Sequence, residues 1–301
     1  MTTSKKVSEY MPFLIMGGLY ILVDGLALLL VNLFASNGVG AFENPDDPMN
    51  ILYFFTLMLV FTGAILLIAR FHKKRVLAGI FMISVGLMCF NIIYLLAGVI
   101  LSDLWAFSFS VGITVMLLVL LMKYPEWYIV DICGLLLGVG SILTIGTSLS
   151  TFLVIMLLSI MAVYDAISVY KTKHMISLAD TVLSLKVPVV LLVPKIRNYS
   201  LMQDTTSLNE KLQKGEERQV FLLGLGDIVF PGALVVSSYN NLASNNLFVA
   251  FGVLIGTLVG YSFLTTLVVK GKPQAGLPLL CGFAILGYFV SVFLLYGKLV
   301  F

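Results

Sequence analysis

Long apolar segments recur along nearly the whole chain and are separated by short polar connections. Each is close to the ~20 apolar residues that an α-helix needs to cross a bilayer. Their continuous apolar runs differ from the short alternating strands of a membrane β-barrel. The pattern predicts nine spans, over residues 11–35, 50–70, 75–100, 103–122, 127–146, 148–170, 219–239, 246–269 and 274–296. We therefore expect an all-α polytopic membrane protein.

Composition and charge support this class. The 301 residues are 60% hydrophobic and 11% charged, whereas soluble domains carry about 25% charged residues. Lys and Arg gather in the even-numbered connections, with Arg70, Lys73, Lys74 and Arg75 together in the second. The first connection is acidic instead. By the positive-inside rule, this alternation predicts an N-inside, C-outside topology in a multi-pass protein of the cell membrane.

The chain divides at one long basic connection. Residues 1–170 form a predicted membrane bundle of six spans, 171–218 an inside loop, and 219–301 the last three spans. The loop begins with "HMISLADTVLSL", whose spacing predicts a short amphipathic helix at the membrane surface. The next stretch, "KVPVVLLVPK", is bracketed by prolines and rich in β-branched residues, which predicts an extended segment.

Four aspartates fall within predicted spans, at positions 24, 131, 165 and 227, and no Lys or Arg falls deep within any span. An ionised carboxylate at the bilayer centre is costly, so each one needs a reason to be there. Asp131 lies near the inner interface, where a structural role is expected. Asp24 lies deeper and fits a protonated acid bonded to a neighbouring helix.

Asp165 and Asp227 differ because the topology brings them to a similar depth. Counted along ideal helices, they lie about 9 and 12 Å from the inner face, on consecutive antiparallel spans. Two carboxyl groups held close together share one proton, so one can draw a proton from water while the other donates to a carbonyl oxygen. Depth alone fits equally well with two protonated aspartates in a helix interface, or with a proton relay.

The local sequences are more specific. Asp165 lies in "AVYDAISVY", Asp227 lies in "LGLGDIVF", and "QAGLPLL" opens the ninth span. These stretches resemble, in order, the Tyr-Asp, Gly-x-Gly-Asp and Pro-Ala-Leu motifs of the presenilin and signal peptide peptidase family, and the chain is similar to its compact archaeal members. The family's Pro-Ala-Leu-Pro corresponds here to Ala275-Gly276-Leu277-Pro278, so only the last two residues match.

The resemblance implies an intramembrane aspartyl protease that hydrolyses peptide bonds in single-span membrane segments. It implies that Asp165 and Asp227 are the catalytic acids and that no metal or other cofactor is needed. The residues expected to contact substrate are Tyr164, Gly224, Leu225, Gly226, Ala275, Gly276, Leu277 and Pro278. Gly224 and Gly226 would admit another backbone beside the carboxyl group. The stretch 187–193 and the residues before Gly224 would pair with an unwound substrate strand.

Other chemistries find less support in the sequence. The two histidines, His72 and His174, lie in connections without an HExxH motif, which disfavours a zinc protease. Cys89, Cys133 and Cys281 lie in spans without CxxC spacing and are expected to be packing residues. The alternatives left open are a proton-coupled transporter or channel and a noncatalytic helper that binds single-span helices. Expected partners are transmembrane-helix substrates, the lipid bilayer and a second copy of the chain, with no nucleic acid.

Overall fold

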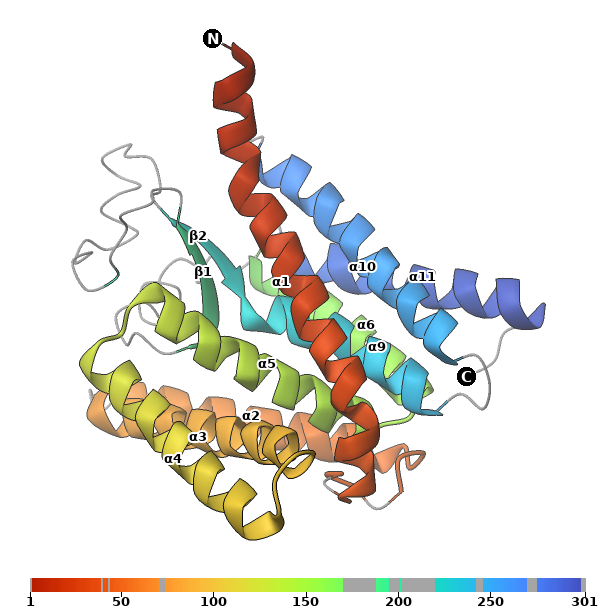
Figure 1. Cartoon of the computed structure of the whole chain (residues 1–301). Helices are drawn as coiled ribbons and strands as arrows, with labels where there is room; N and C mark the ends of the chain where they lie inside the picture. Colours follow the sequence, from red (N-terminus) through yellow and green to blue (C-terminus); the bar gives the residue numbers. More distant parts are fainter. Residues whose placement is uncertain are drawn as a thin grey trace.

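The protein is helical throughout most of its length (Figure 1). The computed structural model describes residues 2–38, 40–42, 44–70, 74–169, 188–194, 201, 220–241, 246–269 and 275–298. Within them the helices are α1 (Thr2–Ser36), α2 (Met49–Arg70), α3 (Lys74–Gly98), α4 (Asp103–Lys123), α5 (Trp127–Ser148), α6 (Thr151–Ile167), α9 (Leu225–Asn241), α10 (Asn246–Val269) and α11 (Gly276–Tyr296). These nine helices follow the nine predicted spans in order and confirm the fold class. The predicted amphipathic segment lies outside the described residues.

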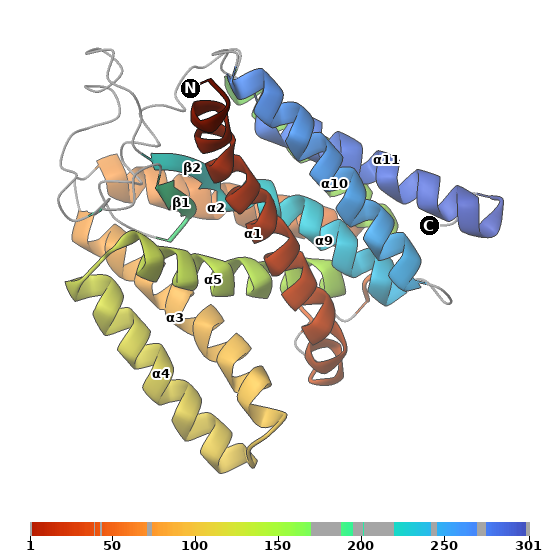
Figure 2. The ribbon, with the colours of Figure 1, turned by 45° about the horizontal axis from the view of Figure 1, so that its top comes forward.

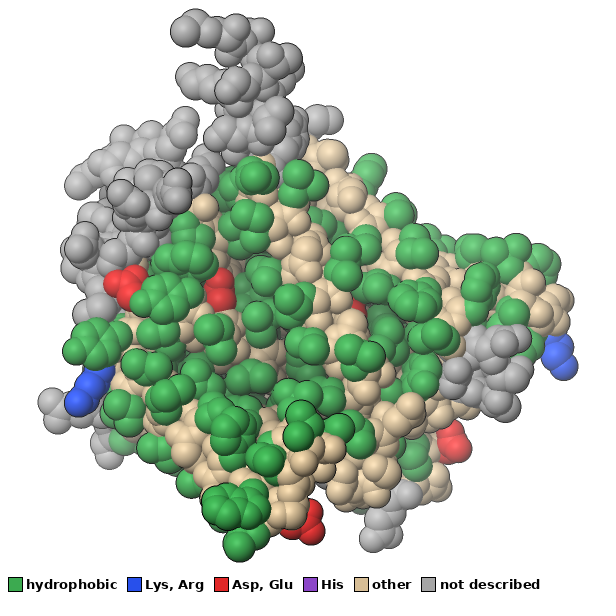
Figure 3. Space-filling view, viewed as in Figure 1, with side chains coloured by type: hydrophobic (Ala, Val, Ile, Leu, Met, Phe, Trp, Pro, Cys, Tyr) green, Lys and Arg blue, Asp and Glu red, His purple; other side chains and the backbone are tan. Residues whose placement is uncertain are grey.

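The outer surface suits a lipid environment. Six helices of the described residues, α1, α3, α4, α5, α10 and α11, include stretches long and apolar enough to cross a membrane. Hydrophobic side chains dominate the face seen in Figure 3, and Leu29, Leu104 and Leu294 are each more than 70% exposed. A soluble protein rarely exposes continuous apolar surface on this scale, whereas acyl chains are a favourable neighbour for it.

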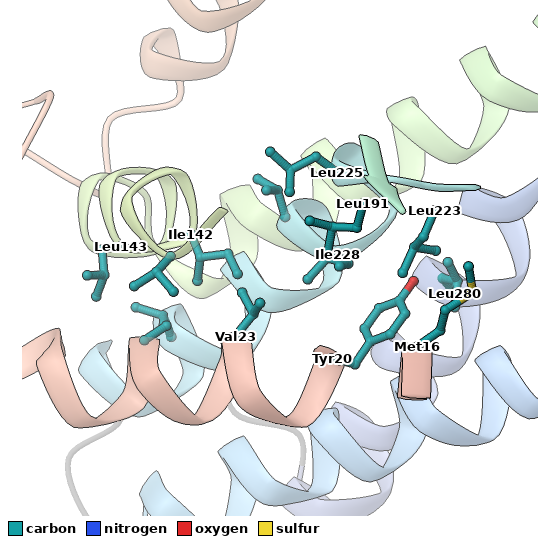
Figure 4. Close-up of a cluster of buried hydrophobic side chains, with 14 of the residues drawn as sticks. Met16, Tyr20, Val23, Ile142, Leu143, Leu191, Leu223, Leu225, Ile228 and Leu280 are labelled. Atoms are coloured by element: carbon teal, nitrogen blue, oxygen red, sulfur yellow. The ribbon is translucent and has the colours of Figure 1, made fainter. Parts of the chain in front are cut away.

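The interior is organised around α5 and α9, which pack against each other (Figure 2). One hydrophobic cluster joins both helices to α1, α10, α11 and the small sheet, and includes Tyr20, Val23, Ile142, Ile228 and Leu280 (Figure 4). A second joins α9 to α6, α10 and α11, and a third joins α5 to α3, α4 and the sheet. Because α9 carries Asp227, packing from both sides fixes the position of that aspartate.

Helices α10 and α11 pack backbone against backbone. Glycines recur on α10 at every fourth position, Gly252, Gly256 and Gly260. A Cβ atom added at Gly256 would overlap the carbonyl oxygen of Phe283, and one added at Gly287 would overlap that of Gly252. Such small-residue repeats let membrane helices approach closely, which favours van der Waals packing where no hydrophobic effect drives association. This contact holds α11 against the rest of the bundle.

Two short strands precede α9 and correct the predicted seventh span. Strand β1 (Val190–Pro194) pairs antiparallel with β2 (Val220–Gly224), with Val190 opposite Gly224 and Pro194 opposite Val220. The helix therefore begins at Leu225 and not at residue 219, because residues 220–224 are extended and bonded to β1. The extended segment predicted over 187–193 is confirmed for residues 190–193, which lie in β1 and pair with β2, whereas residues 188–189 form a turn.

Asp131 secures the sheet to the bundle. Its Oδ1 accepts a hydrogen bond of 2.8 Å from the backbone N–H of Leu192 in β1. Leu192 therefore directs its N–H away from β2, which agrees with the alternation of an antiparallel ladder in which the N–H of Leu225 donates to the carbonyl of Val189. The structural role predicted for Asp131 is thus that of a partner for the outer edge of β1.

Candidate active site

Asp165 lies in the last turn of α6 and faces the interior. Its side chain is 7% exposed. Oδ2 accepts a hydrogen bond of 3.2 Å from the backbone N–H of Leu277, in the first turn of α11. The first N–H groups of a helix have no partner within the helix, so a carboxyl group is well suited to accept one of them. This contact joins the end of α6 to the start of α11.

Asp227 lies in the first turn of α9, directly after β2. Two glycines line its carboxyl group. A Cβ atom added at Gly224 would lie 3.3 Å from Oδ2, and one added at Gly276 would lie 3.2 Å from Oδ1 and 3.3 Å from Oδ2. The carboxyl group therefore occupies a site between the end of β2 and the start of α11, and any larger residue at either glycine would press on it.

The two carboxyl groups meet at the first turn of α11. Asp165 contacts the N–H of Leu277, and Asp227 lies beside Gly276, the preceding residue. Because those two contact points belong to adjoining residues, backbone geometry limits the separation of the nearest carboxyl oxygens to about 10 Å. This limit places both carboxyl groups at one site, where one of them can act as an acid and the other as a base on the same peptide bond.

Comparison with known proteins identifies the family of this chain. A family model described as signal-peptide peptidase, presenilin aspartyl protease matches residues 17–296. The chain belongs to this family. The matched region includes all three motifs, and the family's activity is that of an intramembrane aspartic endopeptidase. The activity and the family together support a protease over the transporter and the noncatalytic helper considered as alternatives.

Solved structures of a presenilin family intramembrane aspartate protease, from two crystal forms, are similar to this chain over nearly its whole length. One is 30% identical, with a TM-score of 0.66, and the match covers 95% of this chain and 99% of that one. The other is 31% identical, with a TM-score of 0.68, and the match covers 93% of this chain and 96% of that one. No curated protein is significantly similar in sequence.

In this presenilin-family protease the residues of the Pro-Ala-Leu-like motif surround the start of α11. Ala275 precedes the helix in an extended conformation and is buried, and Gly276 and Leu277 contact the two aspartates. The side chain of Leu277 is also buried, within the cluster that joins α6, α9, α10 and α11. Pro278 is half-buried in the first turn, where a helix tolerates proline because that N–H has no intrahelical acceptor.

The other residues predicted to contact substrate lie in different surroundings. Leu225 is buried, and its side chain lies 3.3 Å from where a Cβ at Gly138 would be, so it packs against α5. Gly226 is open by comparison, since an added Cβ would meet only the ring of Phe230, at 3.7 Å. Tyr164 is 56% exposed, so its ring faces outward while Asp165 beside it faces inward.

Two features near the site were not predicted from the sequence. The hydroxyl of Tyr20, on α1, donates a hydrogen bond of 3.2 Å to the backbone carbonyl of Asp227. Asp24, one turn further along α1, packs against Gly232 of α9 but is buried without a hydrogen-bond partner for either carboxyl oxygen. The expected bond from Asp24 to a neighbouring helix is therefore wrong. Tyr20 resembles any other aromatic residue of an apolar span, so no local sequence signal distinguishes it. The two histidines lie outside the described residues.

Proposed function

We propose that Asp165 and Asp227 are the two catalytic carboxyl groups of this intramembrane protease. The observation that carries the proposal is their convergence on consecutive residues of α11, Leu277 and Gly276. Asp165 on α6 and Asp227 on α9 are 62 positions apart in the chain, yet both lie against the first turn of α11. Asp24 and Asp131 have other surroundings, against Gly232 and Leu192 respectively.

The reaction requires opposite protonation states in the pair. The ionised carboxylate removes a proton from a water molecule, whose oxygen attacks the carbonyl carbon of the scissile peptide bond. The protonated carboxyl group donates its proton to the carbonyl oxygen, and a tetrahedral diol forms. The carboxyl group that took the proton from water then passes it to the peptide nitrogen, while the other carboxylate removes a proton from the diol. The C–N bond breaks, and the products are a carboxylic acid and an amine. Like charges held close together are costly in an interior of low dielectric constant, which favours one shared proton.

The substrate that this site requires is an unwound stretch of a transmembrane helix. A helical peptide bond is shielded by its own hydrogen bonds, and in lipid its freed N–H and C=O groups need new partners. The outer edge of β2 offers such partners. In the ladder, Leu222 and Gly224 stand opposite Leu192 and Val190, so their backbone groups point away from β1. Within the described residues the sheet has two strands, so no third strand covers this edge.

We infer that the substrate strand pairs with this edge of β2 and not with β1. Asp131 already accepts the outward N–H of Leu192, which leaves β1 a poorer edge for a new strand. A strand bonded at Gly224 lies next to the carboxyl group of Asp227, because a Cβ at Gly224 would be 3.3 Å from Oδ2. Pairing there brings the following peptide bond of the substrate to the catalytic pair.

Cleavage of a purified single-span substrate, followed by mass spectrometry of the fragments, tests the catalytic assignment. We expect Asp165→Ala and Asp227→Ala each to abolish cleavage while expression and helical content stay near those of the wild type. Asp24→Ala is the matched control, because it also removes a buried intramembrane carboxyl group, and it should retain activity. Substantial turnover by either of the first two variants would remove that aspartate from the catalytic role.

The substrate edge is tested by Leu222→Pro. Proline removes the outward N–H of residue 222 but fits the strand, since Pro194 already occupies an equivalent non-bonded position of β1. We expect KM to rise or cleavage to be lost, with the melting temperature little changed. Unchanged cleavage by a folded Leu222→Pro protein would exclude pairing at this residue.

The basic inside connections support placement in the cell membrane, which fractionation of the expressed protein would check.

A further inference from the structure

Helix α9 contains a proline one turn after the aspartate of the active site. In an α-helix the carbonyl of residue i accepts a hydrogen bond from the N–H of residue i+4, and Pro231 stands four residues after Asp227. Proline has no N–H, so the carbonyl of Asp227 loses its usual donor. Pro231 is buried in the bundle. A carbonyl left without a donor in a lipid-embedded interior is costly, so a replacement donor is valuable.

The hydroxyl of Tyr20 is that donor. It lies 3.2 Å from the carbonyl oxygen of Asp227, and the Tyr20 side chain is fully buried. The ring is held in place by its neighbours: the centroid of the Tyr261 ring lies 5.1 Å away, and Met16 and Leu280 belong to the same cluster (Figure 4). The donor therefore comes from α1, more than 200 residues earlier in the chain, and is fixed by packing and not by a mobile loop.

Contacts of α1 lie on both sides of the proline. Tyr20 bonds to Asp227 before it, and Asp24, one turn along the same face of α1, packs against Gly232 directly after it. A Cβ atom at Gly232 would lie 2.5 Å from Oδ1 of Asp24 and 2.6 Å from Cδ1 of Ile142, so the absence of a side chain at Gly232 allows this close approach. The break in the hydrogen bonds of α9 is therefore covered by one helix with fixed contacts at each end.

We propose that Tyr20 is a positioning residue of the protease: its hydroxyl replaces the hydrogen bond that Pro231 cannot give, and thereby holds the backbone of Asp227 where its carboxyl group can react. The proposal rests on the assignment of Asp227 as a catalytic group. It predicts that Tyr20 matters only because position 231 is proline. An amino acid with an N–H at 231 would satisfy the same carbonyl from within α9.

A double-mutant cycle on the full-length protein tests this dependence. Tyr20→Phe keeps the ring and removes only the hydroxyl, and we expect kcat to fall about tenfold with KM within twofold, because a buried acceptor is left unsatisfied beside the reacting group. In the Pro231→Ala background, where the N–H is restored, the same Tyr20→Phe change should alter kcat by less than twofold. The cycle is also read as melting temperature, which needs no activity.

Tyr261→Phe is the matched control. Its hydroxyl also donates to a backbone carbonyl of α1, that of Phe13, but the N–H of Gly17 can serve that carbonyl within the helix. We expect kcat within twofold of the wild type. The proposal would be overturned if Tyr20→Phe changed kcat equally in the wild-type and Pro231→Ala backgrounds, or changed it in neither. Cleavage by Asp227→Ala would instead contradict the catalytic assignment, while the cycle in melting temperature would still report on the hydrogen bond.

Discussion

Gly276 has no reactive side chain, but its contact with Asp227 allows a quantitative prediction. The family motif has alanine at this position, whereas this chain has glycine. A Cβ at Gly276 would lie 3.2 Å from Oδ1 and 3.3 Å from Oδ2 of Asp227. This is tight but can be relieved by a shift of a few tenths of an ångström, so we expect Gly276→Ala to reduce kcat by less than about tenfold.

Gly276→Val should behave differently. Its γ-methyl groups extend about 1.5 Å beyond Cβ, so the carboxyl group of Asp227 must move by about 1 Å to avoid them. A misplacement of about 1 Å at a reacting group costs about 100-fold in rate, which corresponds to about 2.7 kcal/mol in activation free energy. We therefore expect kcat to fall about 100-fold while the helix bundle remains folded.

The assay is single-substrate cleavage at saturation, measured beside melting temperature. Gly282→Val is the control, because Gly282 also lies on α11 but an added Cβ there meets nothing within 4 Å. It makes the same residue change on the same helix without pressing on the site, so its kcat should stay within about twofold of the wild type. A folded Gly276→Val protein with near-normal kcat would refute the placement of Asp227 against α11.

Two further predictions concern pH and access. Activity should follow a bell-shaped pH profile, because at low pH both carboxyl groups are protonated and no base remains, whereas at high pH both are ionised and no acid remains; a rate still rising well above pH 9 would argue against a carboxyl pair. Gly226→Val should abolish cleavage without lowering the melting temperature, since its Cβ would meet only the ring of Phe230 at 3.7 Å and would otherwise occupy space beside Asp227. If the valine variant melts earlier yet cleaves normally at low temperature, Gly226 is a packing residue.

The arrangement of helices was predictable because each span carries a strong local signal. Continuous apolar runs and alternating basic connections do not depend on tertiary contacts. The start of α9 was not predictable in the same way. Residues 220–224 are as apolar as the helix that follows, so hydropathy cannot separate them, and only pairing with β1 makes them extended. The depth predicted for Asp227 assumed a helix that begins at residue 219. That assumption is wrong, because residues 220–224 form a strand.

Motifs identified the two aspartates, but the contacts that hold them lie outside those motifs. Gly252, Gly256 and Gly260 recur at every fourth position of the sequence, which is a signal for close helix packing. No comparable sequence pattern predicts the hydrogen bond from Tyr20 to Asp227. The freed carbonyl could have been anticipated from Pro231, but its donor depends on how α1 crosses α9.

The active site is built from helix ends, and this explains why distant packing should matter to it. Asp165 lies in the last turn of α6, Asp227 in the first turn of α9, and the N–H of Leu277 in the first turn of α11. Helix ends supply free backbone groups, but they are also where helices fray, so their positions depend on neighbours. For α11 the chief neighbour is α10, through Gly256 and Gly287. A larger residue at Gly256 would separate the two backbones and move the start of α11. It would thereby displace the partner of Asp165 without touching either carboxyl group.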